Sequence, residues 1–134
     1  MAPAQPPRPR RSLLYVPGSN ARALAKAASL PVDGVILDLE DAVLPAGKLA
    51  ARAAVLAAAA ARHFGRREVI IRINGLDTEW GLGDLRAAAT SLVDGILLSK
   101  VDEPATLLAA ARVLDELAAP PGLRLWSMAE TPRA

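Results

Sequence analysis

Short apolar runs recur along the chain, and polar residues follow each of them. The runs predict five strands, at residues 12–16, 35–39, 68–74, 95–100 and 123–128. The segments between them predict helices at about residues 21–29, 48–64, 84–92 and 104–117, with Asp84 as the cap of the third. Uninterrupted apolar runs suit strands that are buried on both faces. The alternation therefore predicts an α/β fold with a parallel sheet and right-handed crossovers.

A sequence repeat supports this layout. Residues 32–37 read VDGVIL and residues 93–98 read VDGILL. The two copies are two strand–helix units apart, which is typical of equivalent units in one repeating β/α architecture. An open doubly wound sheet and a (β/α) barrel are both consistent with this periodicity.

Charged side chains gather at the predicted ends of the strands. In parallel β/α folds, functional sites form where the strands end. The three acids at the exit of the second strand are costly to bury without cations or a metal. We therefore expect one site at this edge, built from Asp38, Glu40 and Asp41 after the second strand, Arg72 and Asn74, Ser99 and Lys100, and Glu130.

Two interpretations of this edge are open. Acids on neighbouring strands suit Mg²⁺, which takes one or two carboxylates together with water and substrate oxygens. An arginine beside them, Arg72, suits a substrate carboxylate held by two hydrogen bonds. The alternative is an internal ion-pair network, with Arg72 and Lys100 neutralising the acids, but this leaves Glu130 without a partner. A Schiff base on Lys100 is disfavoured, because a lysine among carboxylates stays charged.

Composition excludes several classes of protein. The chain has 134 residues, which suits one domain, and its net charge of +2 is too small to indicate a nucleic-acid partner. It has no cysteine, which excludes disulfides and a cysteine nucleophile. No apolar run approaches the ~20 residues of a membrane span, and the start lacks the apolar centre of a secretory signal. We expect a cytoplasmic protein without a membrane partner.

The first 11 residues are rich in proline and arginine and have little to bury. We predict a disordered arm over residues 1–11 and a folded domain over residues 12–134. The cluster of Arg8, Arg10 and Arg11 favours a solvated arm over a phosphate-binding one.

Five motifs carry a resemblance to a known family. They are LYVPGSN at 14–20, LDLEDAV at 37–43, RINGLDT at 72–78, LSKV at 98–101 and MAETPR at 128–133. In this order they resemble the citrate lyase β-subunit (CitE-like) proteins, which belong with the malyl-CoA and citramalyl-CoA lyases in the HpcH/HpaI aldolase group. The resemblance implies a TIM-type barrel that assembles as a homotrimer or homohexamer. A whole barrel needs ~250 residues, so we expect about five of its eight β/α units, with an exposed apolar edge.

The resemblance also implies a Mg²⁺-dependent carbon–carbon lyase. Its substrate would be a 3-hydroxyacyl thioester of CoA or of an acyl carrier, such as a malyl, citramalyl or citryl thioester, and it would release a 2-oxo acid. By motif, Arg72 would bind the carboxylate of that acid, and Glu130 would ligate the metal and line the substrate site. Asp38 and Glu40 would be supporting acids near the metal-bound waters.

Other implications concern the thioester and the alternatives. Tyr15, Asn20, Arg22 and Lys26 would approach the CoA or acyl-carrier arm.

The family's second metal ligand is an aspartate on the strand after the ETP motif, which lies beyond residue 134. The alternatives are a catalytically inactive half-barrel that acts as an interaction module, and a pyruvate-type aldolase that works without CoA.

Overall fold

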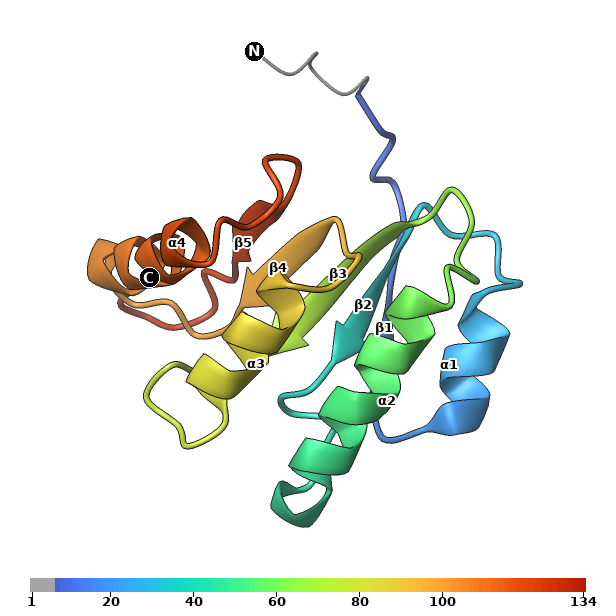
Figure 1. Cartoon of the computed structure of the whole chain (residues 1–134), viewed down its shortest axis with the longest axis horizontal. Helices are drawn as coiled ribbons and strands as arrows, with labels where there is room; N and C mark the ends of the chain where they lie inside the picture. The colour runs from blue at the N-terminus through green and yellow to red at the C-terminus, as the bar shows by residue number, and fades with distance from the viewer. Residues whose placement is uncertain (1–6) are drawn as a thin grey trace.

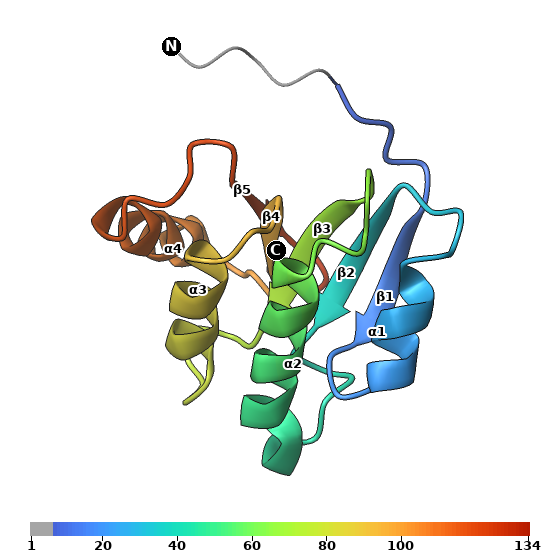
Figure 2. The ribbon, with the colours of Figure 1, turned by 45° about the vertical axis from the view of Figure 1, so that its right-hand side comes forward.

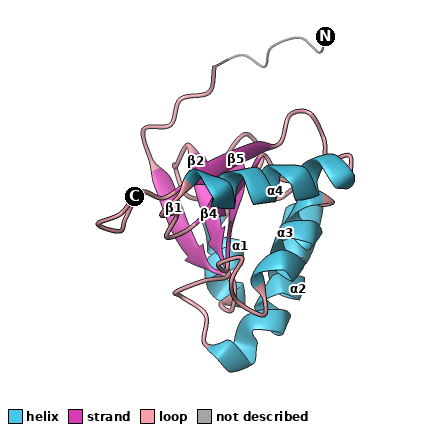
Figure 3. Ribbon diagram, turned by 90° about the vertical axis from the view of Figure 1, so that its left-hand side faces the viewer, coloured by secondary structure: helices cyan, strands magenta, loops and turns pink. Residues whose placement is uncertain are grey.

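The computed structural model describes residues 7–134, and it consists of one parallel sheet with its helices on one face (Figures 1 and 3). The strand order is β1-β2-β3-β4-β5, and every neighbouring pair is parallel. The arrows of β1 and β2 point the same way in Figure 2. The elements are β1 (Leu13–Pro17), α1 (Ala21–Ala27), β2 (Gly34–Asp38), a 3₁₀ turn (Pro45–Gly47), α2 (Lys48–Ala60), β3 (Glu68–Ile73), α3 (Gly81–Ala89), β4 (Gly95–Leu98), α4 (Pro104–Glu116) and β5 (Arg124–Ser127).

The predicted parallel (β/α) architecture is confirmed, and the sheet is open. Within residues 7–134, β1 and β5 each pair with one strand only. The structure therefore contains five strands of a TIM-type barrel without a closed ring. None of the helices in this part of the chain is long and apolar enough to cross a membrane.

The predicted start of α3 was wrong. Asp84 was expected to cap this helix, but α3 begins at Gly81, where the backbone N–H donates to Thr78 Oγ1 at 3.2 Å. A Cβ atom at Gly81 would lie 2.0 Å from the carbonyl oxygen of Gly75, so only glycine lets the chain turn into the helix there. The Asp84 side chain is thereby free to make tertiary contacts. The first two helices also end earlier than predicted, at Ala27 and Ala60.

Side chains alternate between the two faces of the sheet. The face toward the helices carries Val35, Leu37, Val69, Ile71, Ile73, Ile96 and Leu98, which are buried among residues from all four helices. The opposite face, called the inner face below, carries a second apolar cluster of Ile36, Ile70 and Leu97 with Leu13, Trp126 and Met128 against it. Asp38 and Arg72 come two residues after Ile36 and Ile70, so they lie on the inner face as well.

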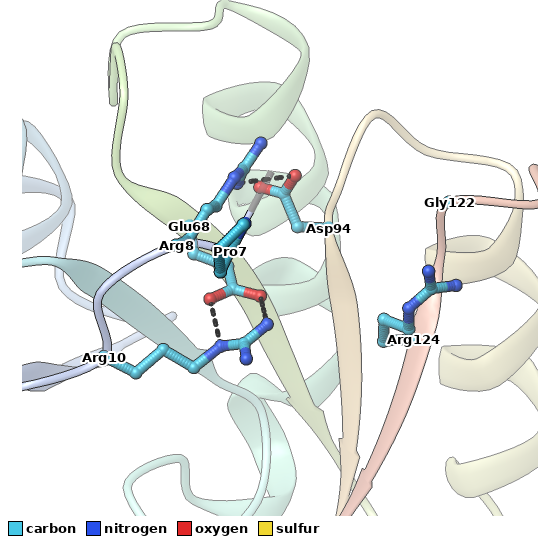
Figure 4. A pocket seen from close by; sticks show the side chains of 7 residues that line it. All are labelled: Pro7, Arg8, Arg10, Glu68, Asp94, Gly122 and Arg124. Atoms are coloured by element: carbon cyan, nitrogen blue, oxygen red, sulfur yellow. Dashed lines mark hydrogen bonds and ion pairs between the residues drawn. The ribbon is translucent and has the colours of Figure 1, made fainter. Parts of the chain in front are cut away.

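Residues 7–11 run along the amino-terminal end of the sheet, where their arginines meet three acids. Figure 4 shows two of these contacts, Arg8 with Asp94 and Arg10 with Glu68. Arg8 lies 3.0 Å from Asp94 before β4, and Arg11 lies 2.9 Å from Asp33 before β2. Arg10 donates two hydrogen bonds of 2.7 and 2.9 Å to Glu68, the first residue of β3. One arginine thus neutralises one acid at each of three adjacent strands. Residues 1–6 of the predicted arm lie outside the described residues, and its disorder stays a prediction.

Arg10→Ala should lower the thermal unfolding midpoint more than the matched change Arg11→Ala. The Glu68 side chain is 4% exposed, whereas that of Asp33 is 14% exposed, so losing Arg10 leaves the more deeply buried charge unpaired. Arg10 also stacks 5.0 Å from the Trp126 ring centroid. Differential scanning calorimetry of both variants measures the difference, and equal midpoints would contradict it.

The ion pair between Arg11 and Asp33 should make stability depend on pH in the acid range. Hydrogen bonds from Arg11 lower the pKa of Asp33 from 3.8 to about 2. A depressed folded-state pKa stabilises the fold above pH 3.8, and this contribution is lost as the pH falls through 2. Urea unfolding midpoints should therefore fall less steeply between pH 4 and pH 2 in Asp33→Asn than in the unmodified protein. The exposed loop variant Asp77→Asn is the control, and identical slopes for all three proteins would refute the assignment.

Candidate functional site

The carboxyl ends of β2, β3 and β4 and the segment after β5 form one cluster of charged side chains, called the mouth below. Its members are Asp38, Glu40, Asp41, Arg72, Lys100 and Glu130. The strands are parallel, so these residues reach the same edge of the sheet although they are far apart in the sequence. The structure therefore brings together the four residues that were given catalytic roles, Asp38, Glu40, Arg72 and Glu130.

A buried ion pair between Asp38 and Arg72 lies at the centre of the mouth. The two residues are direct partners in the β2–β3 register. Arg72 donates through Nε and Nη2 to the two carboxylate oxygens of Asp38, at 2.8 and 2.5 Å. The residues are 1% and 8% exposed, respectively. This contact with Asp38 raises the pKa of Arg72, so its guanidinium carries a permanent positive charge.

Glu40 connects this pair to Lys100. One carboxylate oxygen of Glu40 lies 3.2 Å from Arg72 Nη1, and the other accepts a hydrogen bond from the Lys100 ammonium. Lys100 also lies 3.1 Å from Asp41 Oδ1. The contacts with Glu40 and Asp41 raise the pKa of Lys100, and the bond from Lys100 lowers the pKa of Asp41. Lys100 is thus an ammonium at neutral pH, which disfavours a Schiff-base role.

Glu130 has a partner in the same cluster. Its Oε1 accepts the backbone N–H of Lys100 at 2.9 Å, and the residue is exposed. The pairing of β4 with β5 continues past their ends, because Met128 N–H donates to Leu98 O at 2.9 Å. The ion-pair network that we held as the alternative does form. Glu130 is tied to it through the backbone of Lys100, and its other oxygen has no hydrogen bond within residues 7–134.

The four residues predicted to approach the thioester do not form one cluster. The Tyr15 ring centroid lies 5.0 Å from the Arg72 guanidinium carbon, so Tyr15 belongs to the mouth. Its hydroxyl donates to Met128 Sδ at 3.6 Å. Asn20 is the N-cap of α1 and accepts from Ala23 N at 3.0 Å, whereas Arg22 and Lys26 are exposed on α1. Their contact with CoA or an acyl carrier stays a prediction.

A second set of polar contacts lies behind the mouth, and these contacts were not predicted from the sequence. Lys48 Nζ donates to the carbonyl oxygens of Leu39 and Glu40, at 2.9 and 2.6 Å. Arg52 Nε donates to Asp84 Oδ1 at 2.7 Å, and Asp84 Oδ2 accepts from Asn74 Nδ2 at 2.6 Å. Asn74 was expected to face the site, but it lies between β3 and α3 instead. Lys48 and Arg52 could have been noticed as the only charged residues of an alanine-rich helix, spaced one turn apart.

The donor set of the mouth fits a hard divalent cation. It holds two more carboxylates than cationic side chains, and all donor atoms at issue are oxygens, the ligands that Mg²⁺ prefers. Within residues 7–134, no group of three acidic, histidine or cysteine side chains is arranged to hold a metal by itself. Magnesium is commonly held by one or two carboxylates with water and substrate oxygens. Glu130, which is exposed and has an oxygen without a partner, is the residue that would hold it.

A parallel β/α sheet with such a mouth at its carboxyl edge is the arrangement of TIM-barrel enzymes, where active sites form at that end of the strands. Residues 11–126 match the HpcH/HpaI aldolase/citrate lyase family model, so the chain belongs to this family.

Individual relatives agree with this assignment. The chain is 46% identical over 123 residues to a (3S)-malyl-CoA thioesterase of Cereibacter sphaeroides, covering 92% of this chain and 41% of the thioesterase. It is 40% identical over 95 residues to the citrate lyase subunit beta of Escherichia coli, covering 71% of this chain and 32% of that subunit. The structure of the citrate lyase beta subunit of M. tuberculosis complexed with oxaloacetate and magnesium superimposes with a TM-score of 0.71 and 31% identity, over 92% of this chain and 50% of that one. The chain thus spans half of these relatives or less.

Arg72→Met should destabilise the protein strongly, because it leaves Asp38 charged, buried and without a cation. Breaking a buried pair from one side costs about 3–5 kcal/mol in the free energy of unfolding. The matched control Lys100→Met removes a cation that is 53% exposed and should cost about 0–1 kcal/mol. Urea denaturation measures both values. A loss for Arg72→Met no larger than that for Lys100→Met would show that the Asp38 pair does not stabilise the fold.

Proposed function

We propose that the protein is a Mg²⁺-dependent carbon–carbon lyase that cleaves a 3-hydroxyacyl thioester, such as malyl-CoA, citramalyl-CoA or a citryl thioester, and releases a 2-oxo acid. The observation that carries the proposal is the buried, permanently charged Arg72 at the mouth, joined to the exposed carboxylate of Glu130 through Glu40 and Lys100. Relatives named for malyl-CoA, citrate lyase, oxaloacetate and magnesium support it.

Arg72 is the group proposed to bind the carboxylate of the 2-oxo acid. A guanidinium has five N–H donors. Two of them donate to Asp38, and Nη1 lies 3.2 Å from Glu40, which leaves N–H groups for a substrate. Asp38 keeps the guanidinium in one orientation, and Tyr15 covers one of its faces. The positive charge is therefore in place before the substrate arrives, which is the condition for electrostatic catalysis.

Glu130 would hold the metal, with Asp38 and Glu40 as acids near its waters. When bound, Mg²⁺ would act as a Lewis acid on the oxygen that becomes the carbonyl of the 2-oxo acid. In the reaction, the bond between the hydroxyl-bearing carbon and the carbon next to the thioester breaks. Its electron pair goes to the thioester enolate, the hydroxyl proton is lost, and one proton is returned to the enolate carbon. The balance needs no oxidant or reductant.

A second candidate is hydrolysis of the thioester bond of the same substrate. It is favoured by the identity of 46% to a malyl-CoA thioesterase, against 40% to a citrate lyase subunit. The two activities share a substrate and differ in products. Lyase action on malyl-CoA gives glyoxylate and acetyl-CoA, whereas hydrolysis gives malate and free CoA.

The assembly and location of the protein also belong to the proposal. We expect a homotrimer or homohexamer in the cytoplasm, with CoA or an acyl carrier as the thioester partner. The remaining alternatives are an inactive half-barrel that acts as an interaction module and a pyruvate-type aldolase that does not use CoA.

The test is the reaction of the protein, expressed as its complete reading frame, with malyl-CoA and Mg²⁺. Glyoxylate and acetyl-CoA should form, and chelation by EDTA should stop the reaction. Arg72→Ala and Glu130→Ala should each lower kcat/KM at least ~100-fold per folded molecule, with the folded fraction measured by circular dichroism, because each removes charge stabilisation of the transition state. The control is Arg86→Ala, which changes an exposed residue of α3. Chromatography of the CoA species and a glyoxylate assay measure the outcome.

Each alternative gives a different result. Malate and CoA without glyoxylate would replace the lyase proposal with a thioesterase. Cleavage of free 4-hydroxy-2-oxo acids but not of thioesters would indicate a pyruvate-type aldolase. Self-association with no turnover and no binding of Mg²⁺ with oxaloacetate would indicate an interaction module. Unchanged kcat/KM in Arg72→Ala would refute its role.

A further inference from the structure

Lys48 is a buried lysine that the proposed mechanism does not use. It is the first residue of α2 and is 7% exposed. Its ammonium donates to two consecutive backbone carbonyls, those of Leu39 and Glu40, at 2.9 and 2.6 Å. We infer that Lys48 is a positioning residue, which fixes the peptide of Glu40 and thereby aims the Glu40 carboxylate at Arg72 and Lys100. The inference rests on the proposed function, because it assigns Lys48 to the same site.

The needs of the fold alone do not explain Lys48. A buried ammonium is costly without an opposite charge, and no carboxylate within residues 7–134 pairs with Lys48. Its place in the first turn of α2 is also unfavourable, because the helix dipole is positive there. The Trp80 ring, 5.6 Å from Nζ, offsets only part of these costs. The burial of Lys48 and its place at the start of α2 both cost free energy of folding. Because Lys48 also contacts the mouth directly, a role at the mouth explains it better.

A closed circuit of polar contacts surrounds this anchor. The carbonyl of Leu39 accepts a second hydrogen bond, of 2.9 Å, from Asn74 Nδ2. Asp84 holds Asn74, and Arg52 holds Asp84. Lys48 and Arg52 lie one turn apart on α2, so the circuit begins and ends on the same helix. The carbonyl of Leu39 is therefore held from two sides, by Lys48 of α2 and by Asn74, which follows β3.

The circuit determines which way Glu40 points. The Glu40 N–H donates to Asp38 Oδ1 at 2.8 Å, and its C=O accepts from Lys48. With both peptide groups of Glu40 fixed, the side chain is left to bridge Arg72 and Lys100. Without Lys48, the Glu40 carbonyl keeps only the longer hydrogen bond of 3.2 Å from the Val43 N–H, and the loop loses its link to α2. Asp38 would still hold Arg72, so binding of the substrate carboxylate should persist while the reacting geometry is lost.

The first test separates positioning from binding. In the full protein acting on malyl-CoA with Mg²⁺, Lys48→Met should lower kcat about 10- to 100-fold, the range for partners that orient reacting groups. KM should stay within about 3-fold, because Arg72 is unchanged. Lys48→Arg, which keeps the charge and its donors, should recover most of the lost kcat. Leu49→Met, an exposed change on the same turn of α2, is the control. An unchanged kcat in Lys48→Met, or a rise in KM alone, would overturn the inference.

A second measurement does not depend on activity. In the amide hydrogen exchange of the protein, Lys48→Met should speed exchange of the Glu40 N–H about 10-fold, while the core amide of Ile71 on β3 keeps its protection. A uniform loss of protection at both amides would mean that Lys48 only stabilises the fold, and would overturn the inference. If the unmodified protein turns over no thioester, the proposed function fails, and hydrogen exchange still decides whether Lys48 anchors Glu40.

Chemical rescue gives the sharpest control. The 134 residues contain no cysteine, so Lys48→Cys introduces a single thiol among them. Treatment with bromoethylamine in denaturant, followed by refolding, restores an ammonium at nearly the length of lysine, whereas iodoacetamide adds a neutral amide. The first product should regain protection of the Glu40 amide and the second should not. Equal protection in the two products would show that the ammonium is not what holds this loop.

Discussion

The register between β2 and β3 is the constraint on which the rest of the mouth depends. It sets Asp38 directly opposite Arg72 on the inner face, where the two form a buried ion pair with two hydrogen bonds. A slip of one residue would turn one of them toward the helices and leave both charges buried without a partner. The pair therefore selects one register. That register gives Arg72 its orientation, and Asp38 in turn accepts the backbone N–H groups of Glu40 and Ala42, at 2.8 and 3.2 Å.

The two ends of the sheet differ in how far their acidic side chains are neutralised by cations. At the amino end, Asp33, Glu68 and Asp94 each meet one arginine of residues 7–11, so the acids there are neutralised one by one. At the carboxyl end, Asp38, Glu40 and Asp41 share two cations, and Glu130 bonds only to the backbone N–H of Lys100 within residues 7–134. Neutralisation at the amino end is what stability requires. The mouth has two more carboxylates than cationic side chains, and this is the physical reason to place a divalent cation there rather than at the amino end of the sheet.

The composition of the mouth could be predicted from the sequence, because it follows from local patterns. Apolar runs locate the strands, their parallel order brings the strand ends together, and residues two apart share a face, which is enough to assemble Asp38, Arg72 and Glu130. Contacts between layers could not be predicted in this way. Nothing in the spacing of Lys48 or Asp84 says which carbonyl or amide it meets, since that depends on how α2 and α3 cross the sheet. The start of α3 was misplaced for the same reason, because Asp84 serves Arg52 and Asn74 instead of the helix end.

A lyase and a thioesterase would differ in what happens at the thioester half of the substrate. In the proposed binding mode, Arg72 and Glu130 hold the other half. In both proposed reactions, Arg72 would hold the same carboxylate and Glu130 the same cation. Carbon–carbon cleavage needs water excluded from the thioester carbonyl, whereas hydrolysis needs a water delivered to it. Arg72 is 8% exposed and already surrounded by protein groups, while Glu130 lies at the open side of the mouth. The side of the mouth beyond Glu130 and β5 is therefore where water would be admitted or excluded. Lyase and thioesterase activity would differ there, although both would use the same site for the acid.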